Sequence, residues 1–178
     1  MWEKIGRMLW YLTEATLFHW SPRPLYRWRN FLLRLFGAQV HKSARIRPTA
    51  TIEVPWNLTV GRQSIVGDFA ILYCLGPVSI GERVTISQFA HLCAGSHDFT
   101  RSDMPLLKPP IVIEDDVWVS ADVFVGPGVR ISRGVVVGAR ANVFNDLPAW
   151  KICVGSPAKP VRDREFDSAF SPELRQSD

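Results

Sequence analysis

Residues 113–143 read IEDDVWVSADVFVGPGVRISRGVVVGARANV, and an aliphatic residue returns in this stretch at every sixth position. The returning residues are Ile113, Val119, Val125, Ile131, Val137 and Val143. A period of six fits neither an α-helix nor a simply alternating strand. The density of glycine and β-branched residues also disfavours a helix. We therefore predict a short strand and a corner every six residues, with three strands making one coil of a solenoid.

The same period extends towards the N-terminus, where longer steps interrupt it at regular places. It comprises Val40, Ile46, Ile52, Val60, Val66, Leu72, Ile80, Ile86 and Leu92. The longer steps follow Ile52, Leu72 and Leu92, after every third repeat, so we expect them at one corner of successive coils. Stacked coils would share one core, because a single repeat cannot bury its apolar side chain. The longest step, residues 93–112, is predicted to leave the scaffold as a loop, where functional residues are common.

Composition and charge divide the chain into a basic N-terminal segment and a neutral body. The 178 residues are 47% hydrophobic, enough for one domain with a core. Residues 1–37 hold six Lys and Arg against two Glu, and nine of the twenty aromatic residues. Three cysteines without a CxxC pair favour a reducing compartment. The start lacks the pattern of a cleavable signal peptide, and no apolar run reaches the ~18–20 residues that span a bilayer.

The N-terminal segment is expected to be helical. Apolar residues recur there at helical spacing, and the stretch SPRP at 21–24 interrupts them, so we predict two helices over about 2–19 and 24–36. We expect them to cover the open end of the solenoid, whose strand edges would otherwise be exposed. Arginine beside tryptophan also suits anionic lipid. Peripheral contact with the inner face of the cytoplasmic membrane is therefore a further hypothesis.

The repeat resembles that of the hexapeptide-repeat acyltransferases, because glycine often follows the aliphatic residue and a small or β-branched residue stands four positions after it. SHDF at 96–99, PPIVIEDDVWVSADVFVGPGV at 109–129, GARANVFNDLPAW at 138–150 and GSPAKPV at 155–161 look like the maltose and galactoside type of O-acetyltransferase. Residues 10–40, together with SHDF, resemble the colanic acid biosynthesis acetyltransferase group.

The expected architecture is all-β, a parallel β-helix of about five coils, and its left hand is implied by the resemblance. We assign residues 1–37 to a helical cap segment and 38–163 to the β-helix, with the excursion at 93–112. Residues 164–178 are expected to form a C-terminal tail.

His97 is the candidate general base. A hydroxyl is a poor nucleophile at neutral pH, and imidazole accepts a proton in that range. The resembled family places its catalytic histidine in this loop, sixteen residues after an aliphatic-glycine pair, as His97 follows Gly81 here. Either Asp98 or a backbone carbonyl would orient the ring. The other reading of His97 is a solvated loop side chain.

The resemblance also implies positions for acetyl-CoA. Trp118 matches a tryptophan beside the acyl-CoA site between subunits, although it could instead be a plain subunit contact. Backbone N–H groups near Ser120 would stabilise an oxyanion, and a lysine of the family is replaced here by Asn145. The CoA-binding candidates are Trp118, Ser120, Ala121, Ala139, Arg140, Lys159 and Arg162.

Acceptor recognition is expected to differ from that of the sugar acetyltransferases. Their acceptor-binding asparagine falls at Gly67 in this chain, so lactose-like and maltose-like acceptors are disfavoured. The candidates for acceptor contact are Asp68, Tyr73 and Gln88.

We expect a cytoplasmic homotrimer that transfers acetyl from acetyl-CoA directly to a hydroxyl of a saccharide or lipid-linked saccharide in surface polysaccharide biosynthesis. No metal and no nucleic-acid partner is predicted. One alternative is a γ-carbonic-anhydrase-like metal enzyme, because His91, Cys93, His97 and Asp98 are donors close together in sequence. The other is a β-helix scaffold without catalysis.

Overall fold

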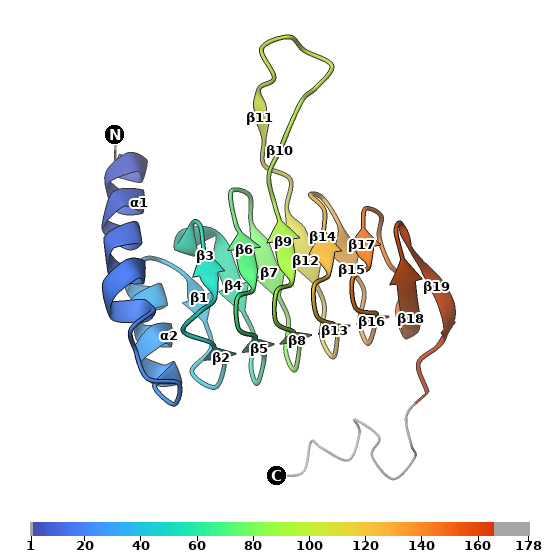
Figure 1. The fold of residues 1–178 in the computed structure, drawn as a ribbon, viewed down its shortest axis with the longest axis horizontal. Helices are drawn as coiled ribbons and strands as arrows, with labels where there is room; N and C mark the ends of the chain where they lie inside the picture. The colour runs from blue at the N-terminus through green and yellow to red at the C-terminus, as the bar shows by residue number, and fades with distance from the viewer. Residues whose placement is uncertain (1, 166–178) are drawn as a thin grey trace.

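The chain winds into a three-sided solenoid with helices across one end (Figure 1). The structure is a computed structural model that describes residues 2–165. Each full coil adds one short strand to each of three sheets, named A, B and C here, and neighbouring coils pair in parallel. Five complete coils precede a partial sixth, which confirms the predicted number.

The strands of each sheet follow the order of the coils. Sheet A contains β1 (Gln39–Val40), β4 (Leu58–Val60), β7 (Val78–Ile80), β12 (Ile111–Ile113) and β15 (Arg130–Ile131). Sheet B contains β2 (Arg45–Ile46), β5 (Ile65–Val66), β8 (Thr85–Ile86), β13 (Trp118–Val119), β16 (Val136–Val137), β18 (Lys151–Gly155) and β19 (Ala158–Asp163). Sheet C contains β3 (Thr51–Ile52), β6 (Ile71–Tyr73), β9 (His91–Cys93), β14 (Phe124–Val125) and β17 (Asn142–Val143).

The six-residue period forms the core. All fifteen aliphatic residues of the period, from Val40 to Val143, are at most 5% exposed. Parallel pairing keeps them aligned from coil to coil, as Val66 pairs with Ile86 and Ile86 with Val119. Burying one such side chain contributes about 1.5–3 kcal/mol, so the stacked column holds the coils together.

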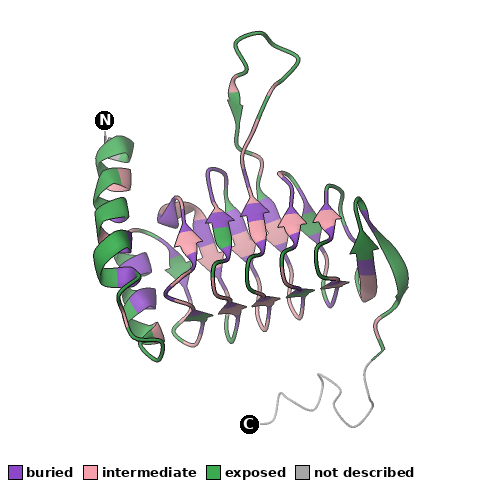
Figure 2. Cartoon of the chain, in the orientation of Figure 1, coloured by how far each residue is buried: buried purple, intermediate pink, exposed green. Residues whose placement is uncertain are grey.

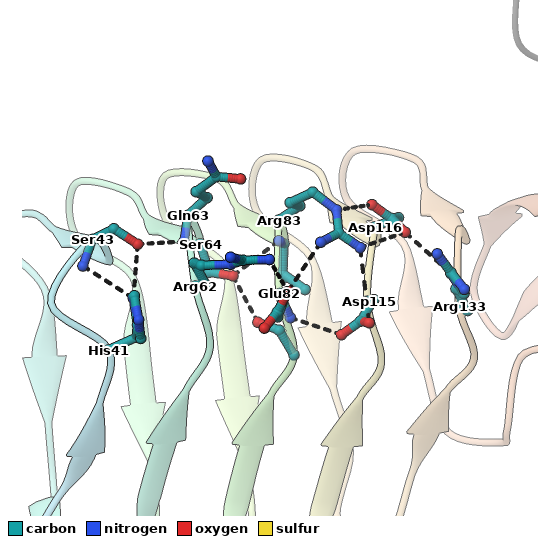
Figure 3. A network of polar contacts seen from close by, with 12 residues as sticks. His41, Ser43, Arg62, Gln63, Ser64, Glu82, Arg83, Asp115, Asp116 and Arg133 are labelled. Carbon is teal, nitrogen blue, oxygen red and sulfur yellow. Dashed lines mark hydrogen bonds and ion pairs between the residues drawn. The ribbon is translucent and has the colours of Figure 1, made fainter. Parts of the chain in front are cut away.

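The corner between sheets A and B carries charged side chains that link successive coils (Figure 3). Arg83 Nε donates to Asp116 Oδ1 at 2.6 Å, and Arg133 Nε donates to Asp116 Oδ2 at 3.1 Å. Burial would raise the pKa of Asp116, but the hydrogen bonds and charges of the two arginines outweigh it and lower the pKa. Because these groups pair with one another, this corner stabilises coil stacking.

Two helical segments precede the first strand. Helix α1 (Trp2–Thr13) continues into the π-helical turn η1 (Glu14–Phe18), and α2 (Tyr26–Leu35) follows a break over residues 19–25. The predicted helices over 2–19 and 24–36 are therefore present, with the interruption at the prolines.

Polar side chains attach these helices to the first coil. Trp10 Nε1 donates to the carbonyl of Ile52 at 2.6 Å, and the Ile52 N–H donates to Glu14 Oε1 at 2.8 Å. Arg29 Nε donates to the carbonyl of Ile46 at 2.7 Å. Groups of β2 and β3 that would pair with a further coil are thus satisfied by the side chains of the N-terminal segment.

Two further features interrupt the regular winding. A hairpin of β10 (Ser96–His97) and β11 (Leu106–Leu107) projects from the corner between sheets C and A (Figure 1). The 3-10 turn η2 (Pro55–Asn57) lies at the same corner of an earlier coil. All three longer steps of the sequence therefore fall at this one corner, as predicted.

The far end of the solenoid closes differently. Strands β18 and β19 pair in antiparallel fashion there. Arg164 Nη1 then donates to the carbonyls of Asp116 and Gly134. The rest of the predicted tail, residues 166–178, lies outside the described residues. All three cysteines are free thiols. No helix within residues 2–165 combines the length and apolarity that crossing a bilayer requires.

Candidate functional site

The hairpin holds His97 in one orientation. His97 Nδ1 lies 2.6 Å from the carbonyl oxygen of Met104, and the imidazole is exposed. Because a carbonyl can only accept, Nδ1 carries the proton and Nε2 of the neutral ring keeps its lone pair. The strand pairing of His97 with Leu106 sets the distance between the two sides of the hairpin. The ring therefore presents a proton acceptor to the space outside the solenoid.

The neighbouring Asp98 has a different role. Its Oδ1 accepts hydrogen bonds from the backbone N of Thr100 at 3.0 Å and from Thr100 Oγ1 at 2.6 Å. Of the two predicted ways to orient the His97 ring, the structure has the carbonyl on Nδ1 and uses Asp98 to hold the turn of the loop.

His91 lies in a different environment. Its half-buried ring packs edge-on against Tyr73 and Phe124, with centroids 6.4 and 5.4 Å away. Burial lowers the pKa of His91. Its Nε2 is buried and has no hydrogen-bond partner among the described residues. His91 is therefore a packed neutral side chain on sheet C. Tyr73, one of the acceptor candidates, belongs to the same edge-on aromatic cluster.

No metal centre is visible in the part of the chain that the structure describes. Within residues 2–165, no three His, Cys, Asp or Glu side chains gather closely enough to hold an ion. The four donors close together in sequence, from His91 to Asp98, do not form such a group. The described residues thus offer no support for the γ-carbonic-anhydrase alternative.

A cleft of about 400 Å³ lies at the corner between sheets B and C. It brings together two of the three acceptor candidates, Asp68 and Gln88. The rings of Phe69 and Phe89 stack at 5.3 Å with an interplanar angle of 8° at its rim. The other lining residues are Arg23, Arg47, Ile65, Gly67, Thr85, Ile86 and Ser87.

Asp68 is fixed within this cleft. Its Oδ1 accepts a hydrogen bond from Thr49 Oγ1 at 2.8 Å, and its Oδ2 accepts one from Arg23 Nη2 at 3.1 Å. Arg47 Nε lies 3.8 Å from the same Oδ2. The carboxylate therefore positions two guanidinium groups, and the cleft combines aromatic rings with charged hydrogen-bonding groups.

Trp118 lies next to this cleft, one coil further along. Its side chain is 47% exposed, and Nε1 donates to Ser87 Oγ at 3.0 Å. Because Ser87 also lines the cleft, the indole and the cleft share one wall. Ala121 lies at the same corner on the coil of Trp118 and Ala139 on the following coil, and the exposed Ala139 N–H has no partner within residues 2–165.

The backbone pairing engages one of the N–H groups expected near the oxyanion, that of Ser120 itself. Its N–H donates to the carbonyl of Val137 at 3.0 Å in the strand ladder, and its side chain is buried. A donor already used between coils cannot stabilise an oxyanion. Arg140 at the same corner pairs with Asp122 at 3.3 Å and stays largely exposed.

Lys159 and Arg162 lie on β19 at the C-terminal end of the solenoid. Both side chains are exposed. Arg162 lines a surface hollow with Ile152, Asp163 and Glu165. The structure therefore leaves both basic groups accessible, beyond the coils that carry Trp118 and Ala139.

The predicted residues form two groups at different corners. Asp68, Gln88 and Ala139 lie between the sheet B and sheet C strands of their coils, and Trp118 lies on β13 just before the equivalent corner; these four residues are called the row below. The hairpin of β10 and β11, which carries His97, projects instead from the corner between C and A (Figure 1). Within one chain, His97 therefore lies away from the row.

Several residues at these two places escaped the sequence analysis. They are Met104, whose carbonyl orients His97, and the cleft residues Arg23, Arg47, Phe69, Ser87 and Phe89. One signal was available for the phenylalanines, because they occupy equivalent positions of consecutive coils, twenty residues apart.

The comparisons with known proteins bear on this geometry. A protein of Escherichia coli (strain K12) named as a colanic acid biosynthesis acetyltransferase, WcaF, is 51% identical over 156 residues, which are 88% of this chain and 86% of that protein. The chain belongs to the hexapeptide-repeat acetyltransferases. A galactoside O-acetyltransferase of the same strain is 27% identical over 76% of this chain and 68% of its own length. No family model matches the chain.

Solved structures of hexapeptide-repeat acetyltransferases superpose over most of the chain. One from Vibrio cholerae, complexed with acetyl coenzyme A, has a TM-score of 0.80 at 28% identity and covers 92% of this chain and 89% of that one. A galactoside acetyltransferase in complex with coenzyme A has a TM-score of 0.83 at 23% identity, over 91% and 82% of the two chains. The likeness to the second shows the shared fold. Family membership makes this chain an acyltransferase rather than a passive scaffold.

Proposed function

We propose that this acetyltransferase uses acetyl-CoA to acetylate a hydroxyl of a saccharide or lipid-linked saccharide in surface polysaccharide biosynthesis. The observation that carries the proposal is the orientation of His97, whose Nδ1 is tied to the Met104 carbonyl and whose Nε2 is left to accept a proton. The relative named for colanic acid biosynthesis and the Vibrio complex with acetyl coenzyme A support the acceptor class and the acyl donor.

The proposed reaction is direct transfer. His97 Nε2 takes the proton of the acceptor hydroxyl as its oxygen attacks the thioester carbonyl. The tetrahedral intermediate then collapses, the C–S bond breaks, and the imidazolium returns the proton to the departing thiolate. Cys74 and Cys153 play no part, because both are buried in the core and burial raises the pKa of both thiols.

The position of His97 supports a homotrimer with its sites between subunits. The hairpin carries the base away from the row formed by Asp68, Gln88, Trp118 and Ala139. In a cyclic trimer, the hairpin of one subunit can lie over the corner between sheets B and C of the next. We assign acetyl-CoA to Trp118, Ala121, Ala139, Arg140, Lys159 and Arg162 of that row and of β19.

The cleft beside Trp118 is the proposed acceptor subsite. Its stacked phenylalanines offer an apolar surface for a sugar ring, and Asp68 and Gln88 offer hydrogen bonds to hydroxyl groups. Arg23 comes from the N-terminal segment, so the acceptor would contact both parts of the chain.

The test is acetyl transfer to a panel of neutral, acidic and lipid-linked saccharides, read by mass spectrometry. We expect one acetyl group on at least one acceptor, with transfer dependent on acetyl-CoA and lost in the Phe69→Ala, Phe89→Ala double variant. A thermal shift with acetyl-CoA in both proteins serves as the control, since the variant should still bind the donor. The proposal would be contradicted if the protein turned over acetyl-CoA but acetylated none of the saccharides in the panel.

A further inference from the structure

The N-terminal helices expose a broad apolar side, although apolar side chains such as Trp10 and Leu33 already fill their contact with the coils. The residues of α1 that recur at helical spacing face away from the coils, and Figure 2 shows that side of the helices as exposed. Met8 and Leu12 are 63% and 65% exposed, while Glu14 is buried. In α2, Leu35 is 68% exposed and Arg29 fully buried. An ordinary surface helix turns polar residues to solvent opposite its buried apolar stripe, whereas these helices carry large apolar residues on the exposed side as well.

The exposed apolar residues form one outer face at the end of the solenoid. Trp20, in the connection between the helices, is 85% exposed. Trp28 and Phe31 stack with ring centroids 5.8 Å apart. Soluble proteins rarely leave so many large apolar side chains together unless the surface binds something. The outer face comprises Ile5, Met8, Leu9, Leu12, Leu17, Trp20, Leu25, Trp28, Phe31 and Leu35.

Charge indicates what covers this outer face. Lys4, Arg27 and Arg34 are exposed on the same helices, and none of them pairs with a carboxylate of residues 2–165. The two acidic residues of the segment are engaged elsewhere, since Glu14 is buried and Glu3 lies 4.0 Å from Lys108. A second copy placed face to face would bring like charges together, whereas an anionic surface would complement them.

We infer that this outer face docks on an anionic lipid bilayer, with the two helices lying in the plane of the interface. Apolar side chains enter the acyl boundary, tryptophan occupies the headgroup level, and the cations meet anionic headgroups. The solenoid then projects away from the bilayer, with the cleft near its membrane-proximal end. This inference is independent of the proposed function, because none of the residues of the outer face belongs to the proposed catalytic or binding sites.

The test is sedimentation of the full-length protein with vesicles of phosphatidylcholine alone or mixed with phosphatidylglycerol. We expect binding to the mixed vesicles at low salt that weakens at 1 M salt, where the Debye length is ~3 Å. Leu12→Glu with Leu35→Glu should lower the partition coefficient by about tenfold or more, because both carboxylates would enter the interface. Arg27→Gln should lower it about fivefold.

Val161→Glu is the matched control, since Val161 is an exposed valine on β19 at the opposite end. It should bind vesicles as the unaltered protein does. The Leu12→Glu, Leu35→Glu variant should keep its acetyl-CoA thermal shift, which separates this test from that of the proposed function. Failure of the full-length protein to bind mixed vesicles at low salt overturns the inference. The inference is also overturned if the protein without lipid forms an assembly larger than a trimer and the Leu12→Glu, Leu35→Glu variant does not. The outer face would then be a contact between copies of this chain.

Discussion

His97 is positioned by a main-chain atom, and this leads to a sharp prediction. We expect His97→Ala to lower kcat by roughly 10²–10⁴, the usual contribution of a positioned general base. The dissociation constant of acetyl-CoA and the melting temperature should hardly change, because the exposed ring contributes nothing to the core. Steady-state kinetics and calorimetry measure the three quantities.

His91→Phe is the control, since a phenyl ring can keep the edge-on packing against Tyr73 and Phe124. It should retain most of the turnover. Near-native turnover in His97→Ala together with an inactive His91→Ala would show that the wrong histidine has been assigned.

Trp118 leads to a second prediction. The bond from its Nε1 to Ser87 Oγ fixes the exposed indole, and a neutral hydrogen bond contributes about 0.5–1.5 kcal/mol. Ser87→Ala should therefore raise the KM for acetyl-CoA about fivefold with little change in kcat. Trp118→Ala should raise it further. An unchanged KM in both variants would reduce Trp118 to a subunit contact.

His97 was singled out because imidazole can accept a proton at neutral pH and because the resembled family places a histidine in this loop. Its role as the base stays a prediction. The orienting carbonyl of Met104 could not be found, because every residue has a carbonyl and only the hairpin decides which one is near. The sequence could not show for a related reason which N–H near Ser120 is free, since strand pairing, which no residue type reports, engages the N–H of Ser120 itself.

Within the N-terminal helices, Arg29 should be essential for stability. Its guanidinium donates to the carbonyls of Ile46, Pro22 and Arg23 and to Ser21 Oγ. Arg29→Gln would leave the buried Ile46 carbonyl and part-buried acceptors unpaired, and an unpaired buried acceptor costs about 1–3 kcal/mol. We expect the free energy of unfolding to fall by roughly 3 kcal/mol or more.

Arg27→Gln, two residues earlier on the exposed side of the same helix, makes the same chemical change and should leave stability within about 0.5 kcal/mol. Chemical denaturation compares the two variants. Equal effects would mean that the network around Arg29 contributes little.

Glu14 makes the stability of the same region depend on pH. Burial raises its pKa from 4.5 to about 7, although the Ile52 N–H opposes the shift. The folded protein therefore holds this proton more tightly than the unfolded chain does. As pH rises from about 4.5 to about 7, ionisation of Glu14 progressively destabilises the fold.

Glu14→Gln removes this ionisation and keeps an oxygen for the Ile52 N–H. One pKa unit corresponds to about 1.4 kcal/mol, so the variant should be more stable than the unaltered protein at pH 8 by up to the order of 3 kcal/mol. The difference should vanish near pH 4. Thermal melts across this range measure it, and a pH-independent difference would contradict the buried-acid explanation.

The elements themselves were largely predictable. A six-residue period places strands and corners because only a coil buries every sixth side chain, and the prolines at 22 and 24 separate the helices. The orientation of the helices was not predictable, because a stripe such as Ile5, Met8 and Leu12 looks alike whether it faces a core or the outside. Which face of the helices is buried depends on the carbonyl groups that the first coil presents to them. The positions of these groups follow from the folded coil and not from the sequence of the helices.

For the whole molecule, the proposed sharing of sites between subunits predicts complementation between two impaired variants. In the proposed site, His97→Ala lacks the base and Trp118→Ala weakens donor binding, so each homotrimer alone should be impaired. Trimers formed after unfolding and remixing equal amounts should regain up to about a quarter of full activity, because a quarter of the sites combine an intact hairpin with an intact row. Activity that equals the mean of the two parents would place the complete site within one chain.

Light scattering on the unaltered protein should give about 60 kDa, three chains of 20.1 kDa. An active monomer would exclude the shared site. The constant coil length made it possible to predict that Asp68, Gln88 and Ala139 lie one after another along the solenoid. The contact with a neighbouring subunit could not be predicted, because no repeat in a single sequence reports it.

The side chains that satisfy β2 and β3 come from the part of the chain that leaves the ribosome first. Synthesis proceeds at about 5–20 residues per second, so Trp10, Glu14 and Arg29 are present before the strands they bind. The strand edges of the first coil are then already satisfied, and each new coil adds to the opposite edge. That edge stays open until β18 and β19 close the solenoid. We expect nascent chains stalled after β9 to protect the Ile52 N–H from exchange already. The coils of this solenoid would then assemble in one direction, from the N-terminal helices towards β19.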